Sequence, residues 1–250
     1  TAAILSACSG KQQEGKQQKV PQTVLLVSAA SSLKDSLERI VQSYESLNEN
    51  IRIQLNFASS GTLQQQIEQG APADLFLSAG RKQMEVLQEK GLVRESHDVL
   101  ANELVLILSS DYAGRDVTEA DRLLNADLQH IAIGEPDSVP AGIYARQALT
   151  SLGLWDKLSS RLVYARDVRH VLTLVETGNA DAGIVYRTDV QAGDQVRLAF
   201  AFPPEAYDPI VYPFGVISQS EHLAEAEAFM EYLKSEEALR IFRDYGFRQP

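Results

Sequence analysis

The sequence of 250 residues predicts an α/β fold with mainly parallel sheets. Three observations support this prediction. Short apolar runs alternate with amphipathic segments from Val24 onward, a second series of the same kind begins near Glu103, and two helical segments end the chain. Two strand–helix series followed by a tail permit two lobes, with the chain crossing between them more than once.

The first series covers residues 23–91. Residues 23–29 form a β-rich run of the kind expected for a strand covered on both faces, and residues 31–47 show helical spacing. Strands are expected at 51–58 and 73–79, each followed by a helix, the second of which ends at Gly91. The apolar stripe predicted for the first helix consists of Leu33, Leu37, Ile40, Val41, Tyr44 and Leu47.

The second series alternates in the same way. A helix is expected from Pro140 to its end at Gly153, and another from Asp167 to Gly178. The apolar runs of this series lie at 103–110, 130–136, 161–165 and 181–186. After a further apolar stretch at 209–218, helices at 223–235 and 237–246 end the chain.

Composition restricts the partners of the protein. Its 23 basic and 34 acidic residues give a formal charge of -11, which argues against nucleic acid or an anionic membrane surface, because both select basic patches. No apolar run approaches the length of a membrane span. An anion bound by this chain must therefore be held by local hydrogen-bond donors.

Residues 1–22 are expected to form a leader remnant and a tether. Leu5-Ser6-Ala7-Cys8 resembles the lipobox of bacterial lipoproteins, in which the cysteine carries the lipid. The alternative for Cys8 is a buried or free thiol. Polar, low-complexity residues follow it, which is typical of a flexible linker. A single cysteine also excludes an intrachain disulfide.

Small and hydroxyl-bearing residues gather where the predicted strands end. In open α/β sheets, ligands bind beyond the carboxyl ends of strands, where helices begin with unpaired N–H groups and a partial positive charge. A helix that starts with bare backbone can therefore hold an anion through its amides. The turns of this character are Ala30-Ser31-Ser32, Ser59-Ser60-Gly61-Thr62, Val139-Pro140-Ala141-Gly142, Arg166-Asp167-Val168 and the strand end Tyr186.

Each of these residues also has a purely structural explanation. Serine and threonine are preferred N-caps, as is Asp167 before Val168, and proline in a first helical turn needs no ligand. Tyr186 is explained equally well as a core aromatic residue or as a hydroxyl donor in a pocket. Occurring together in the expected places, the five turns favour an anion-binding site.

Catalytic and metal sites find less support in the sequence. The four histidines are scattered, no pair has metal-ligand spacing, and nucleophile-elbow, P-loop and dinucleotide-binding motifs are absent. No nucleophile with a nearby base and no carboxylate placed for a metal is evident, so no cofactor is expected. Arg146, Arg169 and Arg187 are expected on solvated helix faces, and the alternatives are pairing with a larger phosphate or with neighbouring Asp and Glu residues.

Five segments stand out when they are taken together and in order: "SAASSLKDSLERI", "NFASSGTLQQQIEQGAPADLFLSAG", "GEPDSVPAGIYARQAL", "DVRHVLTLVETGNADAGIVYRTD" and "FRDYGF". Together they resemble the substrate-binding proteins of bacterial molybdate ABC transporters. The resemblance implies a type II periplasmic-binding-protein fold, with two α/β lobes, two crossover segments and an oxyanion in the cleft between them. Lobe 1 is then expected to comprise residues 23–102 plus 214–250, and lobe 2 residues 103–213.

The resemblance also implies the ligand contacts and the function. The contacts are the hydroxyls and amides of two serines, the backbone amides of two helix starts and one phenol. These residues are Ser32 and Ser60, Ala141 and Val168, and Tyr186. Gly142 is expected to let the anion approach. The implied protein is a monomeric extracytoplasmic receptor, lipid-anchored through Cys8, that delivers molybdate and tungstate to a permease and is not an enzyme.

One departure and three alternatives stay open from the sequence. Arg187 follows Tyr186 where the resemblance leads us to expect a small residue, so a cation can lie near the cleft. The alternatives are a sulfate or phosphate receptor, an enzyme with Ser32 or Ser60 as nucleophile, and a cytoplasmic anion sensor. A phosphate site needs an acceptor for the P–OH proton, and none is evident among the five residues.

Overall fold

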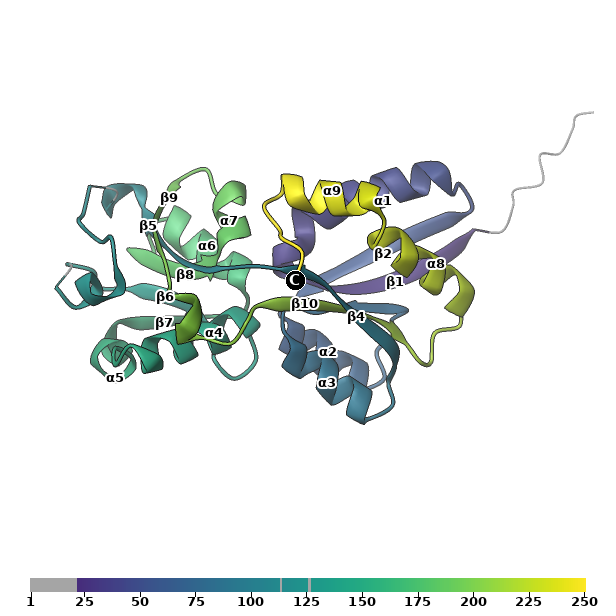
Figure 1. Cartoon of the computed structure of the whole chain (residues 1–250), viewed down its shortest axis with the longest axis horizontal. Coiled ribbons are helices and arrows are strands. Elements are labelled where there is room, and N and C mark those ends of the chain that lie inside the picture. Colours follow the sequence, from purple (N-terminus) through teal and green to yellow (C-terminus); the bar gives the residue numbers. More distant parts are fainter. Residues whose placement is uncertain (1–21, 113, 126) are drawn as a thin grey trace, which may run out of the picture.

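The two strand–helix series fold into two lobes, each built around a five-stranded sheet (Figure 1). The structure, a computed structural model, describes residues 22–112, 114–125 and 127–250. The predicted α/β fold of two lobes is confirmed. The predicted leader and tether, including Cys8, lie outside the described residues.

The first lobe contains a sheet with the strand order β2-β1-β3-β10-β4. β1 (Thr23–Ala30) pairs in parallel with β2 (Ile51–Ala58) and β3 (Leu75–Leu77). β10 (Val211–Ile217) runs antiparallel to both β3 and β4 (Val93–Ala101). One face of the sheet is covered by α1 (Lys34–Leu47), α8 (Leu223–Leu233) and α9 (Glu236–Asp244), and the other by α2 (Ser60–Glu68) and α3 (Arg81–Glu89) (Figure 1).

The second lobe repeats this plan with the strand order β7-β6-β8-β5-β9. β6 (Ile131–Gly134) pairs in parallel with β7 (Leu162–Ala165) and β8 (Ala182–Tyr186). β5 (Leu104–Ser109) runs antiparallel to both β8 and β9 (Val196–Ala201). The helices are α4 (Pro140–Ser151) and α5 (Trp155–Leu158) on one side and α6 (Val168–Glu176) and α7 (Arg187–Ala192) on the other (Figure 1).

Helical periodicity explains how the covering helices bury one side. In α6, Val168, Val171, Leu172 and Val175 are buried, and they recur at the spacing of one helix face. The stripe predicted for α1 is confirmed except at Leu47, which is 66% exposed. Leu47 is the last residue of α1 and therefore extends beyond the packed part of the helix.

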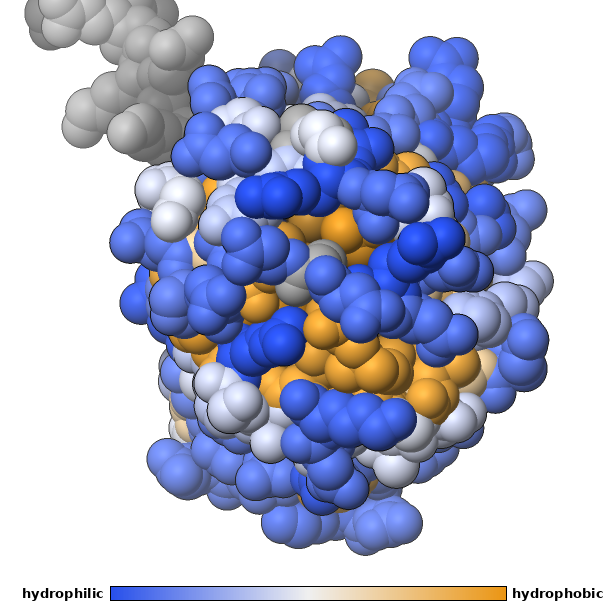
Figure 2. Space-filling model, turned by 90° about the vertical axis from the view of Figure 1, so that its left-hand side faces the viewer, coloured by the Kyte–Doolittle hydropathy of each residue, from blue (hydrophilic) through white to orange (hydrophobic). Residues whose placement is uncertain are grey.

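The surface of the second lobe is mostly hydrophilic. At the end of this lobe, hydrophilic side chains surround smaller apolar areas (Figure 2). Over the described ranges, the exposed large apolar side chains are Val24 and Leu47 in the first lobe and Tyr164 in the second. None of the helices in those ranges combines the length and the apolar character needed to cross a bilayer.

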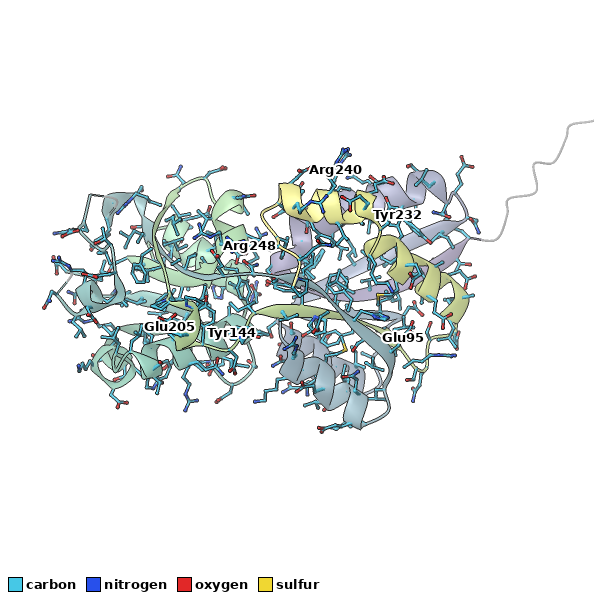
Figure 3. All side chains as sticks on the ribbon, viewed as in Figure 1. Glu95, Tyr144, Glu205, Tyr232, Arg240 and Arg248 are labelled. Atoms are coloured by element: carbon cyan, nitrogen blue, oxygen red, sulfur yellow. The ribbon has the colours of Figure 1, made fainter. Side chains whose placement is uncertain are left out.

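The chain passes between the lobes twice, and the two passages are tied together. The first lies at Asn102 and Glu103, between β4 and β5, and the second covers residues 202–210, between β9 and β10. The amide of Asn102 donates to the carbonyl of Ile210 over 3.1 Å. Ala101 and Arg248 exchange two backbone hydrogen bonds of 2.7 and 3.1 Å, which brings the C-terminal residues to the same junction (Figure 3).

Gly142 is required by packing within the second lobe. A Cβ atom added there would lie 2.1 Å from the carbonyl oxygen of Gly134, at the end of β6. Packing alone therefore requires glycine at this position, and the expectation that Gly142 gives an anion access to the backbone stays a prediction. The missing side chain lets the first turn of α4 lie against the end of β6.

We expect Gly142→Ala to lower the free energy of unfolding by about 1 to 3 kcal/mol, because the added methyl group overlaps a backbone oxygen. Gly114→Ala is the matched control, since an added Cβ there meets nothing within 4 Å. Urea unfolding of both variants measures the difference. Equal stability of the two variants would contradict this role of Gly142.

Candidate functional site

The five residues predicted to bind an anion line one cavity between the lobes. The first lobe contributes Ser32 and Ser60, and the second contributes Ala141, Val168 and Tyr186. The cavity measures about 10 Å³, which is room for about one water molecule, so the lobes must part slightly to admit a larger anion. The other lining residues are small or apolar: Ala30, Ser31, Ala58, Ser59, Ala79, Val139 and Pro140.

Strand direction brings these residues together. In the first lobe, Ser32 lies in a 3₁₀ turn directly after β1, and Ser60 begins α2 just after β2. In the second lobe, Val168 begins α6 after β7, and Tyr186 is the last residue of β8. Because parallel strands share one direction, their carboxyl ends meet at one edge of each sheet. Both of these edges face the same cavity.

The helix-cap explanation applies to Ser59 but not to the two predicted serines. Ser59 is the N-cap of α2, and its Oγ accepts from the amide of Thr62 over 3.1 Å. The Oγ of Ser60 instead accepts from the amide of Ala79 over 2.9 Å. The Oγ of Ser32 lies 3.0 Å from the hydroxyl of Tyr212. Both hydroxyls are buried beside the cavity.

The starts of α4 and α6 present backbone amides. The predicted cap at Asp167 is confirmed, since its Oδ1 accepts from the amide of His170 over 2.9 Å. Val168, the next residue, then carries the first amide of α6. In α4 the first residue is Pro140, which has no N–H, so Ala141 carries the first amide of that helix. The first amides of a helix have no acceptor within it and are free to hold an anion.

Tyr186 is both a core residue and part of the cavity lining. Its ring packs edge-on against Tyr212 with centroids 5.9 Å apart. Its hydroxyl lies 3.5 Å from the carbonyl oxygen of Ala79, on the opposite lobe. Burial raises the pKa of Tyr186 well above its usual range, so the phenol stays neutral and keeps its hydrogen. Tyr186 is therefore a core aromatic residue that also lines the cavity, and its role as a donor to a ligand stays a prediction.

No charged side chain lines the cavity in the part of the chain that the structure describes. Arg187, which could have entered the cleft, forms an ion pair with Glu103 at the hinge. Arg248 pairs with the other oxygen of the same carboxylate. Arg187 is therefore a hinge residue, and any anion in the cavity meets neutral hydrogen-bond donors.

The prediction of a solvated helix face is wrong for Arg169. Its Nη2 donates to Asp35 Oδ2 of the first lobe over 2.6 Å. Its Nε lies 3.1 Å from Asp189 Oδ1 of its own lobe. Arg169 directly follows Val168 in the sequence, so the cross-lobe ion pair lies next to the cavity lining. Sequence reasoning missed it because Asp35 is 134 residues away in the chain.

Asp189 holds Arg169 in place through a buried ion pair. Its carboxylate is fully buried, and its Oδ2 accepts from the amide of Tyr186 over 3.1 Å. Burial raises the pKa of Asp189 to about 6, although Arg169 and the Tyr186 amide act in the opposite direction. A buried carboxylate thus fixes the backbone at Tyr186 and the direction of Arg169 together.

A backbone contact also joins the lobes at the cavity. The amide of Gly61, in the first turn of α2, donates to the carbonyl oxygen of Ser138 over 3.1 Å. A Cβ atom at Gly61 would lie 2.2 Å from that oxygen, so only glycine permits this approach. The structure therefore shows the lobes in contact beside the predicted binding residues.

The arrangement offers little for catalysis. No histidine lines the cavity, and within the described ranges no group of three His, Cys, Asp or Glu side chains could hold a metal ion. The serine hydroxyls face an amide and a phenol rather than a base. The chemistry that this site supports is hydrogen bonding to a small anion.

Comparison with known proteins gives a consistent picture. Residues 25–248 match the family model described as bacterial extracellular solute-binding protein. YvgL of Bacillus subtilis (strain 168), named as a candidate ABC transporter substrate-binding lipoprotein, is 42% identical over 98% of this chain and 93% of its own. The molybdate-binding protein ModA of Haemophilus influenzae is 40% identical over 88% of each chain. The periplasmic molybdate-binding protein of Azotobacter vinelandii superposes with a TM-score of 0.80 at 27% identity, covering 90% of this chain and 99% of its own.

We expect Asp35→Asn to favour separation of the lobes. Loss of the partly exposed Arg169–Asp35 pair should cost the closed form about 0.2 to 1 kcal/mol, with a larger effect at low salt. Asp98→Asn is the control, because Arg81–Asp98 is an equally short ion pair within one lobe. Small-angle scattering should show a larger radius of gyration for Asp35→Asn only. The same radius for both variants would contradict the prediction.

We expect Asp189 to make folding less favourable as the pH rises from about 4 to about 6. Its pKa of about 6 lies above the usual 3.8, so the folded protein keeps a proton that the unfolded chain has released. Asp189→Asn cannot titrate and should lack this decline. Urea unfolding at pH 4 to 7 gives the free energy of unfolding of the wild type and of the variant. The wild-type value minus the variant value should fall as the pH rises. A constant difference, or an equal effect of the exposed Asp137→Asn, would contradict the prediction.

Proposed function

This chain belongs to the bacterial extracellular solute-binding proteins, and from that premise we propose that it captures molybdate and tungstate and delivers them to an ABC permease. The family acts outside the cytoplasm. Its relatives are binding components of transporters, so the chain is a binding protein and not an enzyme. The identity of the oxyanion and the residues that hold it are our proposal.

One observation carries the choice of ligand class. Neutral donors from both lobes surround one cavity, and among residues 22–112, 114–125 and 127–250 no charged side chain lines it. Charge-assisted hydrogen bonds contribute about 1.5 to 3 kcal/mol each, and several converging on one anion can replace its hydration. The proposed donors are the hydroxyls of Ser32 and Ser60, the amides of Ala141 and Val168, and the phenol of Tyr186.

The absence of a carboxylate from the lining favours anions without a proton. A protonated oxyanion such as hydrogen phosphate needs an acceptor for its O–H group, and the lining offers none with a negative charge. Molybdate and tungstate are unprotonated tetrahedral dianions at neutral pH, and the 40% identical relative is a molybdate-binding protein. These two arguments together favour molybdate and tungstate over phosphate. Sulfate, which is also unprotonated, remains the rival to be tested.

Lobe closure is the proposed mechanism of capture. The hinge consists of the passages at Asn102 and Glu103 and at residues 202–210. An anion that bonds to donors from both lobes stabilises the closed form by its differential affinity for it. The Arg169–Asp35 pair and the Gly61–Ser138 backbone bond then add contacts that exist only when the lobes meet.

Membrane attachment and subunit state complete the proposal. A lipid on Cys8 would hold the receptor near its permease, and the Bacillus relative whose name includes lipoprotein supports this reading. Cys8 itself lies outside the described residues. The receptor would act as a monomer, since each chain carries both halves of its cleft.

Isothermal titration of the domain from residue 22 onward tests the ligand. Molybdate, tungstate, sulfate and phosphate are titrated separately in a buffer that contains none of them. We expect tight binding of the first two and little heat from the others. Tight binding of sulfate or phosphate alone would overturn the named ligand, and no binding of any of the four would overturn the receptor.

Ser32→Ala and Ser60→Ala test the site. Each should weaken molybdate binding by about 1 to 3 kcal/mol, because each removes a hydrogen bond to a charged group. The control is Ser78→Ala, since Ser78 is buried in the same lobe but bonds to Gly80 and does not line the cavity. Circular dichroism checks that all three variants fold. Unchanged affinity in both site variants would remove these serines from the site.

A further inference from the structure

Tyr212 lies behind the cavity and contacts one of its binding residues. It is the second residue of β10, is completely buried, and is not part of the cavity lining. Its hydroxyl lies 3.0 Å from the Oγ of Ser32 and 3.2 Å from the Nδ2 of Asn102. These contacts link the hinge to the proposed ligand site through two side chains.

The orientation of Asn102 is fixed by its own surroundings. Its Oδ1 accepts from the backbone amide of Glu103 over 2.9 Å, and that amide can only donate. The Nδ2 group therefore faces the other way, where it donates to Tyr212 and, over 2.9 Å, to the Oγ1 of Thr188. The Tyr212 oxygen is thus an acceptor toward Asn102.

The hydrogen of the Tyr212 hydroxyl then has one place to go. Burial raises the pKa of Tyr212, so the phenol keeps its hydrogen. Leaving that hydrogen unpaired in a fully buried position would cost about 1 to 3 kcal/mol. In the part of the chain that the structure describes, two polar side chains lie within hydrogen-bond distance of this hydroxyl; Asn102 presents a donor, so the Ser32 oxygen is the acceptor. Tyr212 therefore donates to Ser32.

Because Tyr212 donates to the Ser32 Oγ, the hydroxyl hydrogen of Ser32 cannot point toward Tyr212. Ser32 lines the cavity, so its hydrogen points into the cavity. The hydroxyl of Ser60 is oriented in the same way, because its Oγ accepts from the amide of Ala79 and its hydrogen points away from that amide. Both serines thus present hydrogens to the cavity. For Ser60 the donor behind it is backbone, and for Ser32 it is a replaceable side chain.

We propose that Tyr212 is a positioning residue that, oriented by Asn102, holds the Ser32 hydroxyl as a donor toward the ligand and so favours anions without a proton over those with one. The selectivity rests on the proposed function. The direction of the hydrogen bonds is a property of the chain alone. An anion that turns an O–H toward Ser32 meets a second hydrogen there and loses the bond.

Tyr212→Phe removes the donor behind Ser32 and leaves the serine hydroxyl free to turn. We expect molybdate to bind about threefold to tenfold more weakly, the effect of one hydrogen bond, and phosphate to lose less. The readout is the ratio of the phosphate Kd to the molybdate Kd, with phosphate measured by competition. Tyr207→Phe is the control, because its hydroxyl accepts from Leu104 at the hinge and does not reach Ser32.

Asn102→Asp reverses the direction of the hydrogen bonds. A carboxylate accepts from Tyr212, which leaves the Tyr212 oxygen to accept from Ser32 and turns the serine lone pairs toward the ligand. The added charge should weaken the binding of all dianions alike. The ratio of the phosphate Kd to the molybdate Kd should nevertheless fall further than it does in Tyr212→Phe. An equal loss of affinity for both anions in both variants would leave the Kd ratio unchanged and would overturn the proposal, because Tyr212 would then contribute only to the packing of the site.

A neutron structure of the ligand-free wild-type protein tests the hydrogen-bond direction without any ligand. Deuterium on the Tyr212 oxygen directed at Ser32 is the expected result. Deuterium on Ser32 directed at Tyr212 would overturn the proposal. If the wild type fails to bind molybdate but binds sulfate, the proposed ligand fails, and the two variants are compared with sulfate as the unprotonated anion.

Discussion

The shared direction of parallel strands is the constraint on which the site depends. Each lobe sends the carboxyl ends of three strands toward the cleft, and a helix or tight turn starts after each of them. A helix start leaves backbone N–H groups without partners, and such groups are costly when buried. The amides at Ala141 and Val168 are two examples. Topology therefore supplies donors at the cleft, and small neighbouring residues leave them accessible.

The charged groups described near the cleft form ion pairs with one another and do not line the cavity. Arg169 is held between Asp35 and Asp189, and Arg187 is held by Glu103. The Arg169–Asp35 pair joins the two lobes, the Arg169–Asp189 pair lies within the second lobe, and the Arg187–Glu103 pair lies at the hinge. In a chain with a formal charge of -11, this arrangement leaves a neutral cavity whose attraction for an anion comes from oriented dipoles. Charges stabilise the position of the lobes, while neutral groups line the cavity.

The sequence was sufficient to predict the elements with strong patterns and the residues at the turns between them. It did not indicate β4 or β9, because both lie at sheet edges where polar and charged residues such as Glu95 and Arg197 interrupt the apolar pattern. The cross-lobe pair of Arg169 and the contact of Tyr212 with Ser32 were also missed. The contacting residues are 134 and 180 positions apart, and periodicity carries no information over such separations. Only the packing of the lobes brings them together.

The course of β1 has a mechanical consequence. The strand enters the first lobe at its outer end and runs toward the cleft for 8 residues, a distance of about 26 Å at about 3.3 Å per residue. The C-terminal residues, in contrast, lie at the hinge (Figure 1). A surface that held the protein by residues upstream of Thr23 would immobilise lobe 1 and leave lobe 2 to swing about a pivot far from the point of attachment. A force applied through β1 would therefore be transmitted to lobe 1 and not to the hinge. A force applied at the C-terminal residues would act on the hinge directly.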